Sequence, residues 1–105
     1  MEKTVMHRSS DGGEHSLSLN FTKYHNGQTS ITLYDNADGM PYAHATVCVE
    51  DELLKDGEVA IDNSLEMAGI LDSLIDAKVI DFPHAFIQSE LGRLPVCRII
   101  MLDNQ

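Results

Sequence analysis

Carboxylates are the residues of this chain whose number and spacing most clearly suggest a chemistry. Twelve of the seventeen acidic residues lie between Asp35 and Asp81, where only Lys55 and Lys78 oppose them. This segment therefore carries the whole net charge of −10, and the rest of the chain sums to zero. A concentrated negative surface attracts basic partners and repels nucleic acid and anionic membranes. The charge pattern predicts that the partner is a basic protein surface, with no direct contact to nucleic acid or membrane.

Nine of these acids are the candidate partner-binding residues. Four of the nine share one face of an expected helix: Asp62, Glu66, Asp72 and Asp76. The four spread carboxylates along about 20 Å of helix, and backbone phosphates of a nucleic acid recur at comparable intervals. Carboxylates in such a row can take the place of phosphates in the groove of a nucleic-acid-binding protein. The alternative is a solvated face that only keeps the protein soluble. The candidate residues are Glu50, Asp51, Glu52, Asp56, Glu58, Asp62, Glu66, Asp72 and Asp76.

The cysteines and histidines offer no spacing that favours a metal site or a nucleophile. His44 and Cys48 share a strand face, but four residues along a strand span about 13 Å, too far for one ion. The sequence contains no Cys-x-x-Cys or His-x-x-x-His pair, and Cys48 and Cys97 are expected to be buried thiols. We therefore expect no metal, no cofactor, no catalytic residue and no enzymatic activity. A small enzyme with a pocket between helix and sheet is an alternative that no motif supports.

The elements that must position the acids are mostly strands. Apolar and polar residues alternate along His15 to Tyr24, which is typical of a half-buried strand. Asn26-Gly27 and Asp38-Gly39 are turn sequences, because these pairs accept positive φ at little cost. Strands are predicted at His15–Tyr24, Gln28–Tyr34, Pro41–Val49, Ala85–Ser89 and Leu94–Leu102, with a short extended piece at Val59–Ile61 and one helical turn at Asp51–Lys55.

One amphipathic helix is predicted between Asn63 and Lys78. Asn63 is a favourable N-cap, and Glu66 stands three residues later, as a capping box requires. At 100° per residue, the apolar side chains other than Leu65 gather on one broad face opposite the acids, and Leu65 lies near the acidic side. The apolar face consists of Met67, Ile70, Leu71, Leu74 and Ile75.

These elements predict an α+β fold in which one antiparallel sheet of about five strands carries the helix on one face. An N-terminal meander and a C-terminal hairpin supply the strands, and residues 1–105 form a single domain. Residues 1–14 are either a flexible arm or begin with a short strand at Thr4–His7. The sequence has no stretch with the length and apolarity of a signal peptide or membrane span. A cytoplasmic location is expected.

One set of turn and core residues runs through most of the chain: Tyr24-x-Asn26-Gly27, Ile31-x-Leu33, Asp38-Gly39-x-Pro41-Tyr42-Ala43-x-Ala45-Thr46-Val47, Asp62, Glu66, Gly69, Leu71, Leu74 and Pro95-Val96-Cys97-Arg98. This set resembles an uncharacterised family of small bacterial proteins associated with mobile elements. The resemblance implies a phage, a plasmid or an integrated element as the setting, and it assigns no catalytic residue. Mobile elements encode small acidic anti-CRISPR and anti-restriction inhibitors, which often act as DNA mimics, so the analogy extends to function.

Charge and resemblance together predict a non-enzymatic inhibitor. Its acidic region would bind a basic, nucleic-acid-binding surface of a host defence complex, in the manner of an anti-CRISPR protein. The alternative is a self-associating structural or regulatory module of a mobile element. That alternative depends on the apolar last strand and on the sheet edges, which could pair in a homodimer.

Overall fold

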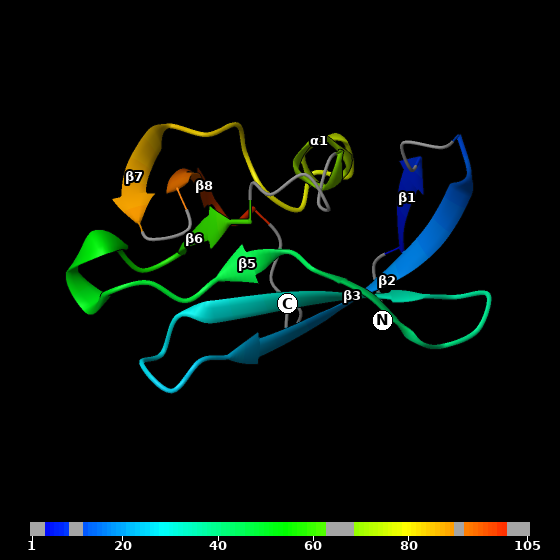
Figure 1. Ribbon diagram of the computed structural model, residues 1–105, viewed down its shortest axis with the longest axis horizontal. Helices are drawn as coiled ribbons and strands as arrows, with labels where there is room; N and C mark the ends of the chain where they lie inside the picture. The colour runs from blue at the N-terminus through cyan, green and yellow to red at the C-terminus, as the bar shows by residue number, and fades with distance from the viewer. Residues whose placement is uncertain (1–3, 9–11, 63–68, 90–91, 101–105) are drawn as a thin grey trace.

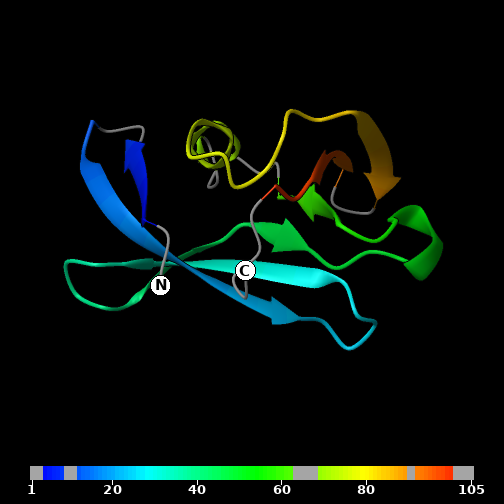
Figure 2. The ribbon, with the colours of Figure 1, turned by 180° about the vertical axis from the view of Figure 1, so that it is seen from behind.

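The computed structural model describes residues 4–8, 12–62, 69–89 and 92–100, and these residues form two four-stranded antiparallel sheets and one α-helix (Figures 1 and 2). The α+β class is confirmed, but the prediction of one sheet of about five strands is wrong. The first sheet has the order β1 (Thr4–Arg8), β2 (Glu14–Lys23), β3 (Thr29–Asp35), β4 (Pro41–His44). The second has the order β5 (Thr46–Val47), β6 (Glu58–Ile61), β8 (Gly92–Arg98), β7 (Ala85–Ser89).

The first sheet is the predicted meander with one strand added at its start. Leu19 lies opposite Leu33 in the pairing of β2 with β3, and both side chains are buried, as the alternating pattern predicts. Gly27 adopts a φ of 88° in the turn between these strands, a backbone conformation that glycine accepts without steric cost. Of the two alternatives for the N-terminus, the strand is observed, because β1 pairs with β2 along its whole length.

The chain changes sheets at Ala45, and this is why one predicted strand at Pro41–Val49 becomes β4 and β5. The amide of Ala45 donates to the carbonyl of Ile31 in the first sheet, at 2.9 Å. The carbonyl of Ala45 accepts from the amide of Asp62, just beyond β6 in the second sheet, at 2.8 Å. Ala45 and Thr46 are both buried, so the alternation of buried and exposed residues is interrupted at the same point. The extended piece predicted at Val59–Ile61 is part of β6.

The helix α1 (Ile70–Asp76) is much shorter than predicted. Its N-cap is Gly69, whose φ of 86° lies in the left-handed region, so a continuous helix from Asn63 to Lys78 is wrong. The predicted cap residues Asn63 and Glu66 lie outside the described residues. The predicted end is close to the observed one, because α1 ends at Asp76. None of the described helices is long and apolar enough to cross a membrane.

One hydrophobic core joins the two sheets and the helix. Ile70 and Leu74 of α1 are buried against it, in agreement with the predicted apolar face. Figure 1 shows α1 beside β1, on the same side of the β2–β3 ribbon as β6 and β8. The buried cluster consists of Val5, Leu17, Leu19, Ile31, Leu33, Ala45, Val59, Ile61, Ile70, Leu74, Val79, Ile80 and Cys97.

Candidate interaction surface

The predicted partner-binding acids form two groups rather than one row. The first group surrounds the short 3-10 turn η1 (Asp51–Leu53), at the outer end of β5 and β6. The described members of the second group are Asp62, which precedes α1, and Asp72 and Asp76 on α1, and this helix is well separated from η1 in Figures 1 and 2. The described partner-binding candidates therefore lie at two places on the molecule.

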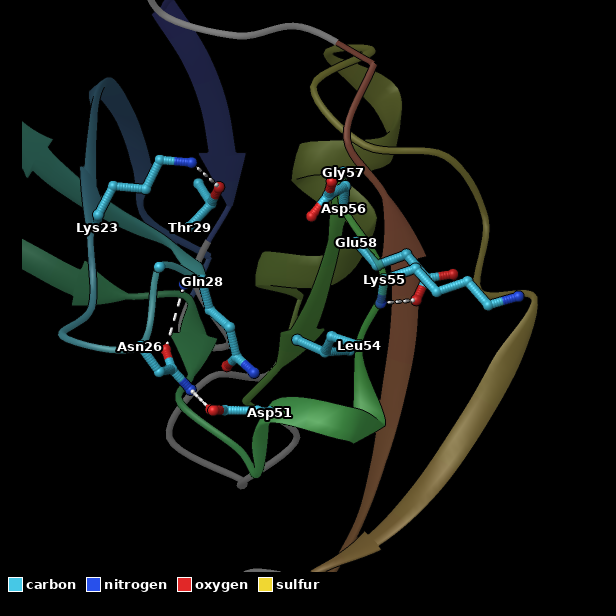
Figure 3. Close-up of a pocket in the computed structure, with 11 residues that line it drawn as sticks. Lys23, Asn26, Gln28, Thr29, Asp51, Leu54, Lys55, Asp56, Gly57 and Glu58 are labelled. Atoms are coloured by element: carbon cyan, nitrogen blue, oxygen red, sulfur yellow. Dashed lines mark hydrogen bonds between the residues drawn. The ribbon is translucent and has the colours of Figure 1, made fainter.

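The loop that carries the first group of acids is hydrogen-bonded to two amide side chains of the β2–β3 turn. Asn26 Nδ2 donates to the carbonyl of Val49 at 3.0 Å and to Asp51 Oδ1 at 2.9 Å. Gln28 binds the backbone of Val49 twice, since its Oε1 accepts from the amide at 3.0 Å and its Nε2 donates to the carbonyl at 3.1 Å. Figure 3 shows Asn26, Gln28 and Asp51 facing one another across this junction. These contacts fix the acidic loop relative to the first sheet.

Replacing Gln28 by alanine tests this junction. The substitution removes two hydrogen bonds to a part-buried backbone, which we expect to cost about 1–3 kcal/mol of unfolding free energy. Hydrogen exchange at the amide of Val49 should accelerate at the same time. The matched control is Gln88→Ala, because Gln88 is an exposed glutamine on β7. Equal unfolding midpoints for the two variants in urea would show that the Gln28 contacts do not hold the loop.

Both carboxylate oxygens of Glu58 have hydrogen-bond partners within the fold. Its Oε1 accepts from the backbone amide of Lys55 at 2.9 Å, and its Oε2 lies 2.7 Å from His84 Nε2. The Lys55 amide, with the smaller help of His84, lowers the pKa of the Glu58 carboxyl below its ordinary value. Glu58 therefore remains ionised and connects the loop to His84, the residue just before β7.

The second group does not make the predicted 20 Å row along a helix. Asp62 precedes the helix and is only half-exposed, and Glu66 lies outside the described residues. Asp72 and Asp76 are the two members that α1 carries, and both are exposed. Seven helical residues span about 10 Å. The prediction of a 20 Å row of carboxylates on one helix face is thus wrong, although the exposed charge on α1 remains.

Five of the predicted acids keep their carboxylates open to solvent. Within the described part of the chain, none of these five side chains makes a hydrogen bond or an ion pair. Their charge is therefore not neutralised by the fold and remains available to a partner. We call them the open carboxylates: Glu50, Glu52, Asp56, Asp72 and Asp76.

A cavity of about 340 Å³ lies between the acidic loop and the β2–β3 turn (Figure 3). Lysines and carboxylates line it together, and Lys23 Nζ donates to Thr29 Oγ1 at 3.4 Å. The lining contains no cysteine, histidine or serine that could act as a nucleophile or general base. Its chemistry is that of a polar cleft. The lining residues are Lys23, Asn26, Gly27, Gln28, Thr29, Asp51, Leu54, Lys55, Asp56, Gly57 and Glu58.

The cysteines and His44 lie where their environments explain them. Burial, with a smaller effect of Asp81, raises the pKa of the Cys97 thiol to about 11, which makes it a poor nucleophile. Cys48 is only half-buried, against the prediction. His44 Nε2 lies 2.6 Å from the Tyr24 hydroxyl on the exposed side of the first sheet. The described residues contain no group of three or more histidines, cysteines or acids arranged to hold a metal ion.

Comparison of the chain with protein-family models, with curated proteins and with solved structures found no match.

Proposed function

We propose that this chain is a non-enzymatic binding protein of the cytoplasm, and that its acidic surface occupies a basic, nucleic-acid-binding surface of a host defence complex. This is the role of an anti-CRISPR-like inhibitor from a mobile element, with partial mimicry of DNA charge. The observation that carries the proposal is the set of open carboxylates, which the fold displays without neutralising them. Opposite charges on two proteins accelerate their encounter and select the partner.

The anchoring of the acidic loop also supports the proposal. Asn26 and Gln28 hold the backbone at Val49, so Glu50 and Glu52 do not have to be ordered when a partner binds. A preformed surface binds with a smaller entropic cost than a disordered one. Two charged groups at separate places fit a partner that offers two basic contact points, such as the opposite walls of a nucleic-acid groove.

Capture of the partner from lysate of the native host tests the function. Tagged protein is incubated at about 50 mM and about 200 mM salt, and the bound proteins are identified by mass spectrometry. We expect one nucleic-acid-binding complex to be enriched at low salt, to weaken at high salt and to be displaced by duplex DNA. A partner that DNA does not displace, or recovery of the tagged chain alone, would contradict the proposal.

A second candidate function is self-association through β7. This strand is an edge of the second sheet, and its sequence Ala85-Phe86-Ile87-Gln88-Ser89 contains no charged residue to discourage pairing with another strand. The side chain of Phe86 is 50% exposed, and that of Phe82 just before the strand is 70% exposed. In a chain of net charge −10, an uncharged edge is the place where two copies repel each other least.

The variant Phe86→Asp distinguishes the two candidates. If two copies pair along β7, light scattering should give twice 11.6 kDa for the parent and 11.6 kDa for the variant. Met40→Asp is the control, because Met40 is a comparably exposed apolar side chain in a turn of the first sheet. A parent that remains monomeric at all concentrations tested rules out self-association.

A further inference from the structure

Two histidines connect the helix to the first sheet, and neither belongs to the acidic surface. His7 of β1 is only 4% exposed, and its Nδ1 lies 2.9 Å from the Ser73 hydroxyl on α1. The helix also approaches this imidazole with its backbone, since a Cβ placed on Gly69 would come within 3.2 Å of His7 Cε1. The ring of His7 therefore lies between its own strand, β1, and the start of α1.

His15 of β2 extends this contact across the sheet. It lies directly opposite His7 in the pairing of β1 with β2, with 6.4 Å between the ring centroids. The ring of Tyr42 on β4 contacts both imidazoles, at centroid distances of 5.6 Å from His7 and 4.7 Å from His15. On its other side, His15 Nδ1 lies 3.0 Å from Asp35 Oδ2 on β3. A continuous series of contacts thus runs from α1 to β3.

The environment of His7 opposes its protonation. Burial and the nearby His15 lower the pKa of His7 below its ordinary value, burial having the larger effect. The hydrogen bond to Ser73 does not oppose protonation, because a hydroxyl can accept from a charged imidazole as well as donate to a neutral one. The neutral form of His7 is therefore the form that fits under α1.

Within the described residues, no carboxylate makes a hydrogen bond or an ion pair with His7. Asp35 binds His15, and its pKa is lowered mainly by the amide of Ala37 and then by His15. Arg8 and Glu14 form an exposed ion pair with each other at 2.6 Å. The titratable or charged groups on β1 to β4 and α1, as the structure describes them, are Arg8 of β1, Glu14, His15 and Lys23 of β2, Tyr34 and Asp35 of β3, Tyr42 and His44 of β4, and Asp72 and Asp76 of α1.

We propose that His7 and His15 form a pH-sensitive latch that holds α1 on the first sheet at neutral pH and releases it in acid. At neutral pH, a neutral His7 packs under Gly69 and Ser73. In acid, a charged His7 would be buried beside the ring of His15, and no carboxylate of the described residues binds it. When α1 is released, water reaches His7, and its charged imidazole is no longer buried in the core. The helix carries Asp72 and Asp76, so the latch also controls the placement of two open carboxylates.

The direction of the pH dependence follows from linkage. A histidine whose pKa is lowered in the packed state binds its proton more readily when the helix is released. The packed state therefore keeps its full advantage above the ordinary histidine pKa of about 6.5. It loses this advantage progressively as the pH falls from there to the lower pKa of the packed ring.

Nuclear magnetic resonance of the complete chain tests the latch. The Cε1 proton shifts of His7 and His15 are followed between about pH 8 and pH 4.5, a range that brackets the ordinary histidine pKa. Exchange protection of the amides in Ile70–Asp76 is measured over the same range and compared with that in β3. We expect α1 protection to fall about tenfold more than β3 protection, with a midpoint that matches the titration of His7 below its ordinary pKa. Protection that changes equally in α1 and β3, or a His7 that titrates at its ordinary pKa, overturns the proposal.

Two variants separate the latch from general acid sensitivity. His7→Gln removes the titrating ring but keeps a polar side chain near Ser73, and it should abolish the pH dependence of α1; the control His25→Gln, at an exposed histidine, should keep it. Gly69→Ala places a methyl group against His7 and disfavours the φ of 86°. Because coupling is reciprocal, loosening α1 in this way should raise the pKa of His7. An unchanged His7 titration in folded Gly69→Ala overturns the latch even if His7→Gln does not fold.

Discussion

Converting the five open carboxylates to amides is expected to weaken binding of the basic partner by roughly 70-fold. The variant combines Glu50→Gln, Glu52→Gln, Asp56→Asn, Asp72→Asn and Asp76→Asn. An exposed ion pair contributes roughly 0.5 kcal/mol, so five of them sum to about 2.5 kcal/mol of binding free energy. The dissociation constant of the purified complex, measured by calorimetry at low salt, gives the effect directly. The salt dependence of the remaining binding should also be shallower, because fewer counterions are exchanged.

The chain supplies a matched control for this experiment. Five acids lie outside the segment from Asp35 to Asp81, and converting all of them to amides leaves the same net charge as the first variant. If position matters, this control binds nearly as tightly as the parent. Equal weakening of both variants would show that only net charge is recognised and that the open carboxylates are not a site. The control acids are Glu2, Asp11, Glu14, Glu90 and Asp103.

Most strands could be predicted from the sequence because their signals are local. The alternation that buries Leu17 and Leu19 and exposes Asn20 depends on the two-residue period of a strand. Asn26-Gly27 and Asp38-Gly39 could be recognised as turns because glycine accepts the positive φ that both turns have. The apolar run of β8 agrees with its observed place between two neighbouring strands.

The division into two sheets could not be predicted in the same way. The sequence predicts one strand from Pro41 to Val49, because every residue in that stretch tolerates an extended backbone. The change at Ala45 depends on partners far along the chain, Ile31 in one sheet and Asp62 beside the other. Thr46 strengthens the break, since its hydroxyl accepts from the amide of Ile31 at 3.1 Å where a strand neighbour would have supplied a carbonyl.

Prediction of the candidate site from the sequence is limited in the same way. The sequence identifies which residues are acidic, and nine acids could be named on that basis. It does not reveal that Asp51 binds Asn26, 25 residues away, or that Glu58 binds His84, 26 residues away. The helix start is a similar case, because α1 begins after Gly69, which has a left-handed conformation and lies against His7 of β1. Local propensity gives way to tertiary contacts at each of these points.

The second prediction with a large effect is that Leu74→Ala destabilises the whole protein. Leu74 is fully buried where α1 meets both sheets, so its removal leaves a cavity lined by residues of the core. Such a change costs about 3 kcal/mol of unfolding free energy, a large part of the 5–15 kcal/mol that stabilises an ordinary domain. Calorimetry should show a melting temperature lower by roughly 10–15 °C.

Leu71→Ala is the matched control for this loss. It makes the same chemical change in the same helix, so the difference in helix propensity between leucine and alanine cancels. Leu71 is only half-buried, and we expect its replacement to cost roughly 1 kcal/mol. A large difference between the two variants would place α1 on the core by the face that carries Ile70 and Leu74. Equal costs would mean that α1 is not packed by that face, and the latch at His7 would then lose its structural basis as well.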